Sequence, residues 1–414
     1  MENRIGASEN QSSYFLIATG CLLLLLSFGF RSSFGLFVKP ITEANGWGRE
    51  TISVALAIQN LAWGIVAVFA GGLADRFGNA RVVVAGTLCY SLGMALMAGV
   101  DSRWTLHGSA GILVGAGISG TSFGIVLPAM ARAVAESRRQ TVLGVGTAAG
   151  SLGQFAVVPL AQQMIDGYGW IVSLNFLAAT ALVMAFLAIP LSPYSGKVEG
   201  DQLHRDQSVS DALAEAFRHR SFQLLVTGFF VCGFHVAFIT AHMPAFLTDK
   251  GFDTRLGAWS IAIIGLCNVV GSFLSGIWSG RIGKRHLLVG IYVGRAIAIV
   301  LFLCLPMTLT SVLTFSAVMG FLWLATVPPT SGLVAVMFGT RYMALLYGIV
   351  FLGHQIGSFS GVWLGGWLYD RTGSYDGVWW LGAALGVMAA VVHWPIVEKP
   401  FGKMALPSAE SQTH

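Results

Sequence analysis

The sequence predicts an all-α membrane protein with twelve transmembrane helices arranged as two six-helix, pseudo-symmetric halves. Hydrophobic residues make up 55% of the 414 residues and charged residues only 10%, whereas about a quarter of a soluble protein is charged. Apolar segments recur along the chain, and each is long enough to cross about 30 Å of hydrocarbon. In addition, the second half repeats motifs of the first half at a nearly constant offset.

Helices are expected because a helix satisfies its own backbone hydrogen bonds inside a bilayer, where water cannot. The 52 glycines suit close packing between such helices. In the first half, we expect membrane-spanning segments at 14–38, 50–74, 82–100, 104–130, 140–165 and 170–191. In the second half, we expect them at 221–248, 256–280, 286–305, 309–338, 342–369 and 376–396.

The loops between these segments predict the orientation. With a cytoplasmic N-terminus, sixteen Lys and Arg lie on the cytoplasmic side and six outside, and the other two, Arg31 and Arg295, fall inside apolar segments. This bias follows the positive-inside rule and places both termini in the cytoplasm. The expected parts are a cytoplasmic tail (1–13), an N-terminal half (14–191), a cytoplasmic linker (192–220), a C-terminal half (221–396) and a second cytoplasmic tail (397–414). Short loops and compact tails favour a bacterial inner membrane.

Composition and motifs exclude several classes of function. The net charge of +5 comes from short cytoplasmic loops and does not indicate nucleic-acid binding. The five cysteines lie in separate apolar segments, without metal-ligand or disulfide spacing. We find no catalytic motif and no nucleotide-binding loop of the type G-x-x-x-x-G-K-[ST], so we expect neither an enzyme nor an ATP-driven pump, and no metal or other cofactor.

The internal repeat indicates a transporter. The motif at 71–78 recurs at 276–283, which is 205 residues later, and the glycine pattern of 143–167 recurs from 347 at an offset of 204. Two parallel six-helix repeats joined by a cytoplasmic linker are typical of secondary transporters, whose binding site lies between the halves.

The loop at 71–81, G-G-L-A-D-R-F-G-N-A-R, resembles the cytoplasmic motif of the major facilitator superfamily. Glycines allow a tight turn, and an acidic side chain there can pair with basic neighbours and a helix N-terminus. We therefore expect a conformational latch here, although a basic loop that only sets topology would look similar. The expected latch residues are Gly71, Asp75, Arg76, Gly78 and Arg81, together with Arg281 and Gly283 in the second copy, where Gly280 replaces the Asp.

Three further motifs resemble the monocarboxylate-transporter and oxalate–formate-exchanger group of that superfamily. They are R-S-S-F-G-L-F at 31–37, F-G-T-R at 338–341 and Y-D-R-T-G-S-Y at 369–375. The resemblance implies transport of small organic anions by alternating access, with a proton or by exchange, in a protein that works as a monomer. One departure is that the eighth segment carries the uncharged Asn268 and Ser272 where many members of the group hold a basic residue.

The two intramembrane arginines are candidate substrate ligands because a central Arg costs about 2.5–3.5 kcal/mol unless it faces a cavity or a partner. Arg31 lies about eight residues, or about 12 Å, from the outer end of its segment, so contact with substrate and snorkelling to the surface both remain open. Arg295 lies in the ninth segment, which is peripheral in this superfamily. A structural role bonded to carbonyls is the alternative there.

Other polar residues complete the candidate site. His235 and His242 are seven residues apart and share one helix face, where they could bind an anion or relay a proton, or simply be hydrogen-bonded core residues. His354 and Gln355 break the repeat symmetry, and a packing role is open for them too. The remaining candidates for the cavity wall are Asn268 and Trp323, with Asn60 and Gln154 as weaker ones.

We find no Asp or Glu in the middle of any segment, so the cavity is neutral or positive. This favours a small organic anion as the substrate, with any proton carried by His or by the carboxylate of the substrate. The alternative is a carrier for a neutral or aromatic solute, such as a vitamin or a drug, in uptake or efflux. A membrane sensor that kept the carrier fold is a third hypothesis, but we see no appended signalling domain.

Overall fold

The computed structural model describes residues 2–194, 209–339 and 342–400, and all regular elements within these residues are helical. The helices of the first half are α1 (Glu2–Ser33), η1 (Phe34–Phe37), α2 (Val38–Asn45), α3 (Arg49–Phe77), α4 (Asn79–Ala98), α5 (Arg103–Leu106), η2 (His107–Leu113), α6 (Val114–Thr121), α7 (Phe123–Arg132), α8 (Glu136–Ala181), α9 (Val183–Leu187) and η3 (Ile189–Tyr194). Those that follow are α10 (Val209–Arg218), α11 (Arg220–Asp249), α12 (Thr254–Ser279), α13 (Lys284–Cys304), α14 (Leu309–Leu322), α15 (Val327–Phe338), α16 (Met343–Thr372) and α17 (Asp376–His393).

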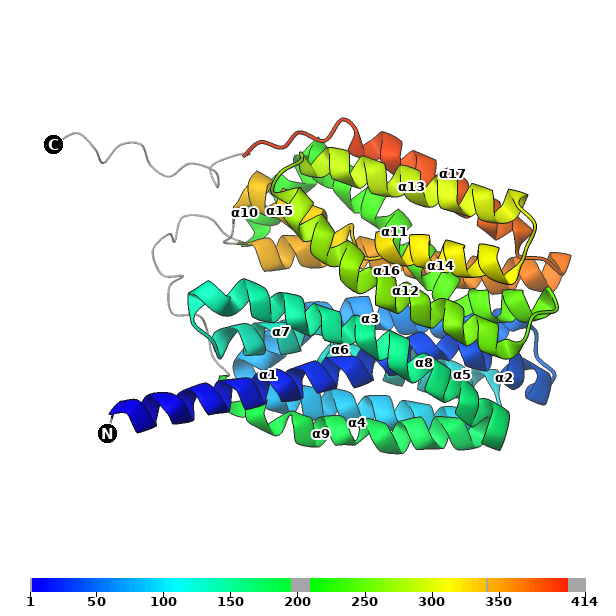
Figure 1. Ribbon diagram of the computed structural model, residues 1–414, viewed down its shortest axis with the longest axis horizontal. Helices are drawn as coiled ribbons and strands as arrows, with labels where there is room; N and C mark the ends of the chain where they lie inside the picture. Colours follow the sequence, from blue (N-terminus) through cyan, green and yellow to red (C-terminus); the bar gives the residue numbers. More distant parts are fainter. Residues whose placement is uncertain (1, 195–208, 340–341, 401–414) are drawn as a thin grey trace.

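Eleven helical stretches among the described residues are long and apolar enough to cross a membrane. The longest, Thr141–Leu187, has 47 residues, and Gly169 interrupts it with φ 81° and ψ 166°. Glycine adopts a positive φ readily because it has no Cβ. The chain turns back at this point (Figure 1), so the stretch holds two of the twelve expected segments. The fold class predicted from the sequence is confirmed.

The two halves form two bundles that lie side by side (Figure 1). They meet along two seams, where α3 packs on α16 and α8 packs on α12. Within the halves, α1 packs on α8 in the first and α11 packs on α16 in the second. The α1–α8 contact of the first half therefore corresponds to the α11–α16 contact of the second half.

Glycines make these repeated contacts possible. A Cβ at Gly153 of α8 would stand 1.9 Å from the carbonyl oxygen of Leu25, and a Cβ at Gly357 of α16 would stand 1.9 Å from that of Phe230. Gly153 and Gly357 are 204 residues apart, which is the offset of the sequence repeat. Small residues of this kind let membrane helices approach closely, which supplies packing energy that apolar side chains cannot gain against lipid.

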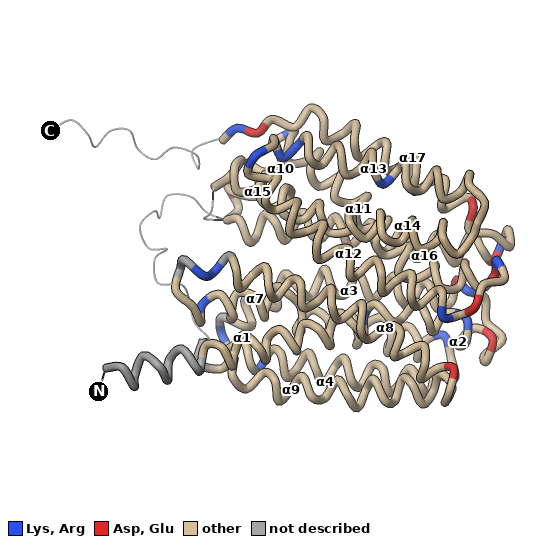
Figure 2. The backbone as a smooth tube through the Cα atoms, viewed as in Figure 1, with Lys and Arg blue, Asp and Glu red and all other residues tan. Residues whose placement is uncertain are grey.

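The two ends of the molecule differ in charge. Helix α10 and residues 132–138 and 396–400 lie at one end, which we call the terminal face. Residues 39–50, 249–255 and 370–376 lie at the opposite end, which we call the distal face. Figure 2 shows mostly Lys and Arg at the terminal face and both signs of charge at the distal face, while the length between them carries few charges.

Candidate functional site

Arg31 occupies the last turn of α1, just before the chain enters η1. Its Nη2 donates to Oδ1 of Asn60 on α3 at 3.3 Å, and its guanidinium carbon lies 4.9 Å from the ring centroid of Trp63. Among the described residues, no carboxylate lies within ion-pair distance of Arg31. The positive charge of this half-buried side chain is therefore not neutralised by any carboxylate that the structure describes.

A small cavity beside Arg31 is built from both halves. It is lined by Arg31, Phe34, Gly35, Leu56, Gln59 and Asn60 of the first half and by Ala237, Thr240, Ala241 and Val362 of the second. Its free volume is about 20 Å³, roughly what a single water molecule needs. The space next to the guanidinium is therefore closed to an organic solute in this conformation.

Aromatic rings pack around Trp63, which lies beside Arg31, and link the two halves. Trp63 on α3 meets Phe351 on α16 with ring centroids 5.3 Å apart, and Phe28 stacks on Phe123 at 4.1 Å. Phe351 also stacks on His354 at 5.6 Å. Arg31 is thus hydrogen bonded to Asn60 and lies against the ring of Trp63, and Trp63 connects it to aromatic side chains of the second half.

Side-chain amides named as candidates lie on the seams and hydrogen bond from one half to the other. The bonds run from Gln355 Nε2 to the carbonyl of Asn60 at 3.0 Å, from Gln154 Nε2 to the carbonyl of Ile261 at 2.8 Å, and from Asn268 Nδ2 to Oγ of Ser151 at 2.9 Å. All of these side chains are buried. They therefore stabilise the present arrangement of the halves directly.

The candidate histidines His235 and His242 lie in the second half, and each forms a hydrogen bond to another helix of that half. Nε2 of His235 is 2.7 Å from the carbonyl oxygen of Gly382 on α17, and Nε2 of His242 is 2.8 Å from that of Val362 on α16. Neither ring is among those that line the Arg31 cavity. This is the geometry of hydrogen-bonded core histidines, and a role in substrate binding stays a prediction for both. His354 differs, since its Nδ1 lies 3.0 Å from Oε1 of the seam residue Gln355.

Arg295 is completely buried and holds a break in a helix. The chain leaves helical geometry between α14, which ends at Leu322, and α15, which begins at Val327. Arg295 donates from Nη2 to the carbonyl of Leu322 at 2.8 Å and also to that of Trp323. Carbonyls at a helix end lack partners within the helix, and a cation there also complements the helix dipole. The geometry is that of the carbonyl-bonded structural alternative, and a role for Arg295 or Trp323 in substrate binding stays a prediction.

The expected latch lies at the terminal face, between α3 and α4. Gly78 has φ 91° and separates the two helices, as the tight turn of the motif requires. Arg76, Arg81 and Arg281 are exposed. The side chain of Asp75 is outside the described residues, so the latch function stays a prediction.

The distal face, by contrast, carries a cluster that joins the halves, in which Arg49 and Tyr375 are buried. We call Arg49, Asp249, Tyr369, Asp370 and Tyr375 the distal cluster. Arg49 forms a two-pronged ion pair with Asp249, in which Nη2 donates to Oδ1 at 2.8 Å and Nη1 donates to Oδ2. Its guanidinium carbon lies 3.8 Å from the ring centroid of Tyr369, and Nη1 also donates to the Tyr375 hydroxyl at 2.9 Å. Burial raises the pKa of the Tyr375 phenol above its ordinary value, so this hydroxyl stays neutral.

Asp370 adds a second tie between the halves. Its carboxylate accepts from the backbone N–H groups of Arg49 and Glu50, both at 2.8 Å, and so caps the N-terminus of α3 from α16. A Cβ at Gly48 would stand 2.3 Å from Oδ2 of Asp370, so a larger residue here would require the carboxylate to move. Three further ion pairs join the halves at the distal face: Lys39–Asp249 at 3.8 Å, Arg371–Glu50 at 3.4 Å and Arg255–Asp166 at 3.6 Å.

Within the described residues, every ion pair that joins the two halves lies at the distal face. The distal face is therefore closed. The ion pairs between the halves are therefore concentrated at the distal end of the described structure.

Sequence reasoning did not select the residues of the distal cluster as functional. Arg49 and Asp249 are 200 positions apart, and the sequence marks Arg49 only as one of the six basic residues of the outer loops. A signal was present in the segment 369–375, whose Tyr, Asp and Tyr all belong to the cluster. The described residues contain no group of three or more His, Cys, Asp or Glu side chains that could hold a metal ion.

Comparison with known proteins identifies the family. The model of the Major Facilitator Superfamily matches residues 20–361 and again 258–413, so the chain belongs to this superfamily of membrane transporters. It is 24% identical to the uncharacterized MFS-type transporter YcxA of Bacillus subtilis, over 84% of this chain and 86% of that protein. It is 25% identical to monocarboxylate transporter 13 of Rattus norvegicus, over 99% of both chains.

The fold is also that of solved transporters. A bacterial homologue of the human lysosomal transporter Spinster, in an inward-facing and unoccupied conformation, superimposes with a TM-score of 0.71 at 13% identity, covering 92% of this chain and 95% of that one. The protein is thus a multi-pass membrane transporter and not an enzyme, as the sequence predicted.

Proposed function

We propose that this protein is a secondary active transporter that carries a small, monocarboxylate-like organic anion across a bacterial inner membrane by alternating access. The observation that carries the proposal is the position of Arg31, a cation between the halves with no carboxylate partner among the described residues. A charged group in an apolar bundle is expensive unless a partner compensates it, and an anionic substrate would be that partner. The overall similarity to monocarboxylate transporter 13 supports the same class of substrate.

The closed distal face supports a rocking mechanism. If the basic terminal face is cytoplasmic, as the positive-inside rule indicates, the present conformation faces inward. The distal cluster and the seam amides would then separate when the halves rock to open the outer side. Substrate would bind beside Arg31, where the cavity of about 20 Å³ must widen to receive it.

Substrate transport could be coupled to a proton or to exchange for a second anion, and the polar residues of the bundle are compatible with either. The described acidic residues lie toward the two ends of the molecule (Figure 2), so a buried carboxylate is not available as a proton carrier. His354, which touches both the aromatic rings and Gln355, is the side chain best placed to carry a proton. A proton could also travel on the substrate carboxylate.

A second candidate function is transport of a neutral or aromatic solute. The ring of Trp63 beside Arg31 favours it, because a flat solute could stack on this ring once the halves separate. An aromatic carboxylate would fit both candidate functions, because its carboxylate could pair with Arg31 and its ring could stack on Trp63.

Uptake by proteoliposomes tests the proposal. Purified protein would be reconstituted and assayed with radiolabelled organic acids and neutral solutes, with and without an imposed pH gradient. We expect saturable uptake of an acid that Arg31→Gln abolishes and Arg31→Lys partly retains, because Lys keeps the charge without the planar, two-pronged geometry. Arg103→Gln, at an exposed distal position, is the matched control and should transport normally. Neutral-solute uptake that Arg31→Gln leaves intact would contradict the anion site and favour the second candidate.

A further inference from the structure

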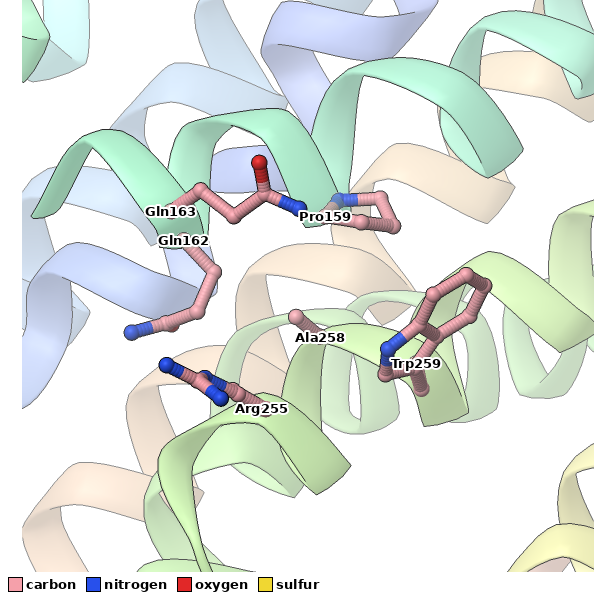
Figure 3. A pocket seen from close by; sticks show the side chains of 6 residues that line it. All are labelled: Pro159, Gln162, Gln163, Arg255, Ala258 and Trp259. Atoms are coloured by element: carbon pink, nitrogen blue, oxygen red, sulfur yellow. The ribbon is translucent and has the colours of Figure 1, made fainter. Parts of the chain in front are cut away.

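The arginines of this protein differ in how their charge is compensated. At the distal face, Arg49 and Arg255 each pair with an aspartate, and Arg255 does so beside the cavity of about 340 Å³ between α8 and α12 that Figure 3 shows. Arg295 is completely buried, and no carboxylate among the described residues lies within ion-pair distance of it. It borders neither that cavity nor the Arg31 cavity. A substrate anion is therefore not its partner in this conformation.

The hydrogen bonds of Arg295 satisfy only part of its guanidinium, which stays protonated in proteins. The carbonyls of Leu322 and Trp323 accept from Nη2, but carbonyls at a helix end supply only a partial negative charge. Nη1 has no hydrogen-bond partner within the part of the chain that the structure describes. An unpaired charge is costly in the protein interior, so a further negative group is expected beside Arg295.

The thiol of Cys232 on α11 also contacts Arg295, and a thiol can ionise. Its Sγ lies 3.6 Å from Nη2 of Arg295 and 3.2 Å from Oγ1 of Thr326, and Cys232 is completely buried. Thr326 is the N-cap residue of α15, so the sulfur also lies near the positive end of that helix. A cationic neighbour and a helix N-terminus both favour a thiolate over a thiol.

The other titratable side chains near this sulfur are not acids at neutral pH. His354 on α16 is hydrogen bonded to the thiol, and Tyr347 on the same helix is a neighbouring phenol. Tyr292 on α13 donates its hydroxyl to a backbone carbonyl at 2.8 Å. His235 of α11 and His393 of α17 are hydrogen bonded to backbone carbonyls. Among the described neighbours of Arg295, Cys232 is therefore the group that can supply a negative charge.

We propose that Cys232 is a thiolate at neutral pH, that it forms an ion pair with Arg295, and that it stabilises a proton on His354. The hydroxyl of Thr326 would then donate to the sulfur. With a thiolate, a guanidinium and a neutral imidazole, the cluster has no net charge, which is the least costly state in an apolar interior. The alternative is a neutral thiol, whose sulfur is only a weak acceptor for Arg295.

The thiolate matters for coupling because the described acidic residues lie toward the two ends of the molecule (Figure 2). A proton that binds His354 would be paired with the thiolate instead of facing the cation of Arg295 alone. Proton uptake would make the cluster positive, and the arrival of an anionic substrate between the halves would offset this charge. This consequence rests on the proposed function, since it concerns a proton that accompanies an organic anion.

The S–H stretching band in the infrared spectrum tests the charge of Cys232 without a transport measurement. A thiol shows this band and a thiolate does not. In membranes at neutral pH, we expect no S–H band from a protein that keeps Cys232 as its one cysteine. The matched control keeps Cys304 alone, which is exposed and lies nine residues, or about 13 Å, along α13 from Arg295. This control should show the full band.

Variants of Arg295 test the ion pair in the protein that keeps only Cys232. Arg295→Lys retains the charge, so the band should stay absent, whereas Arg295→Met should restore it. A full band with Arg295 present would overturn the proposal, and so would a missing band in folded Arg295→Met. If Arg295→Met does not fold, the comparison of the Cys232-only and Cys304-only proteins still decides the charge of Cys232.

Uptake by proteoliposomes tests the link to His354. Cys232→Ser removes the acid, so we expect it to lose the stimulation of organic-acid uptake by an inward pH gradient while exchange of labelled for unlabelled substrate continues. Cys304→Ser is the control and should keep the stimulation. Stimulation that Cys232→Ser retains, or a wild type that a pH gradient does not stimulate, would overturn the role of Cys232 in proton binding. A wild type that takes up no acid at all would instead contradict the proposed function, and the infrared result would still decide the charge of Cys232.

Discussion

The distal cluster should set the balance between the two conformations of the transporter, and Asp249→Asn tests this directly. In the distal-closed state, Asp249 and Arg49 form a two-pronged ion pair whose side chains are only 22% and 9% exposed. When the distal face opens, the two groups separate into water, where each is solvated alone. The substitution therefore destabilises the closed state and leaves the open state nearly unchanged.

The size of the effect follows from the burial of the pair. Exposed ion pairs contribute about 0–1 kcal/mol, and removing one partner of a fully buried pair costs about 3–5 kcal/mol. This pair lies between these limits, and the amide keeps part of the hydrogen bonding, so we expect about 2 kcal/mol. At about 1.4 kcal/mol per factor of ten, the population with an open distal face should rise about 30-fold.

Thiol accessibility measures this population. Thr240, in the wall of the Arg31 cavity, is replaced by Cys in a background without the five native cysteines, and a membrane-impermeant maleimide is added from the distal side. The labelling rate should rise about 30-fold in Asp249→Asn. The control Glu50→Gln removes the exposed partner of Arg371, 3.4 Å away, and should raise the rate no more than about threefold. An unchanged rate in Asp249→Asn, or equal effects of both variants, would refute the assignment of the distal cluster as a gate.

Two further predictions concern stability. Gly357→Ala should lower the melting temperature measured in detergent by several degrees, because the added Cβ would stand 1.9 Å from the Phe230 carbonyl, whereas Gly348→Ala, with no atom within 4 Å, should not; equal melting temperatures would contradict the close packing of α11 on α16. Arg295→Met should destabilise the protein by about 2–4 kcal/mol, since it strips buried carbonyls of their donors. Transport by the folded fraction should keep its KM, and a raised KM would instead place Arg295 at the substrate.

The fold could be predicted from the sequence because hydropathy, loop charge and an internal repeat all report it directly. Segment lengths predict twelve crossings, and the 47-residue stretch agrees with this, because the non-helical backbone of Gly169 divides it into two crossings. The glycines at 153 and 357 repeat for a physical reason, which is the close approach of two helix backbones in each half.

The candidate site could be predicted only in part from the sequence. Asn268 and Gln355 lie on the seams, because an uncharged polar side chain in an apolar helix needs a partner and finds one on the other half. The seven-residue spacing of His235 and His242 showed that the rings share a face, but it could not show which helices that face would meet. The distal cluster could not be predicted from the sequence. Its ion pair joins the ends of two helices from different halves, so it depends on how the halves are arranged.

The most direct test of the central claim compares matched pairs of solutes in proteoliposomes, each pair consisting of a small organic acid and its amide of nearly the same shape. If Arg31 anchors a carboxylate, the acid of at least one pair enters saturably, its amide does not, and Arg31→Gln removes the difference. Equal uptake of acid and amide, unaffected by Arg31→Gln, would contradict the anion site and leave a transporter for neutral solutes.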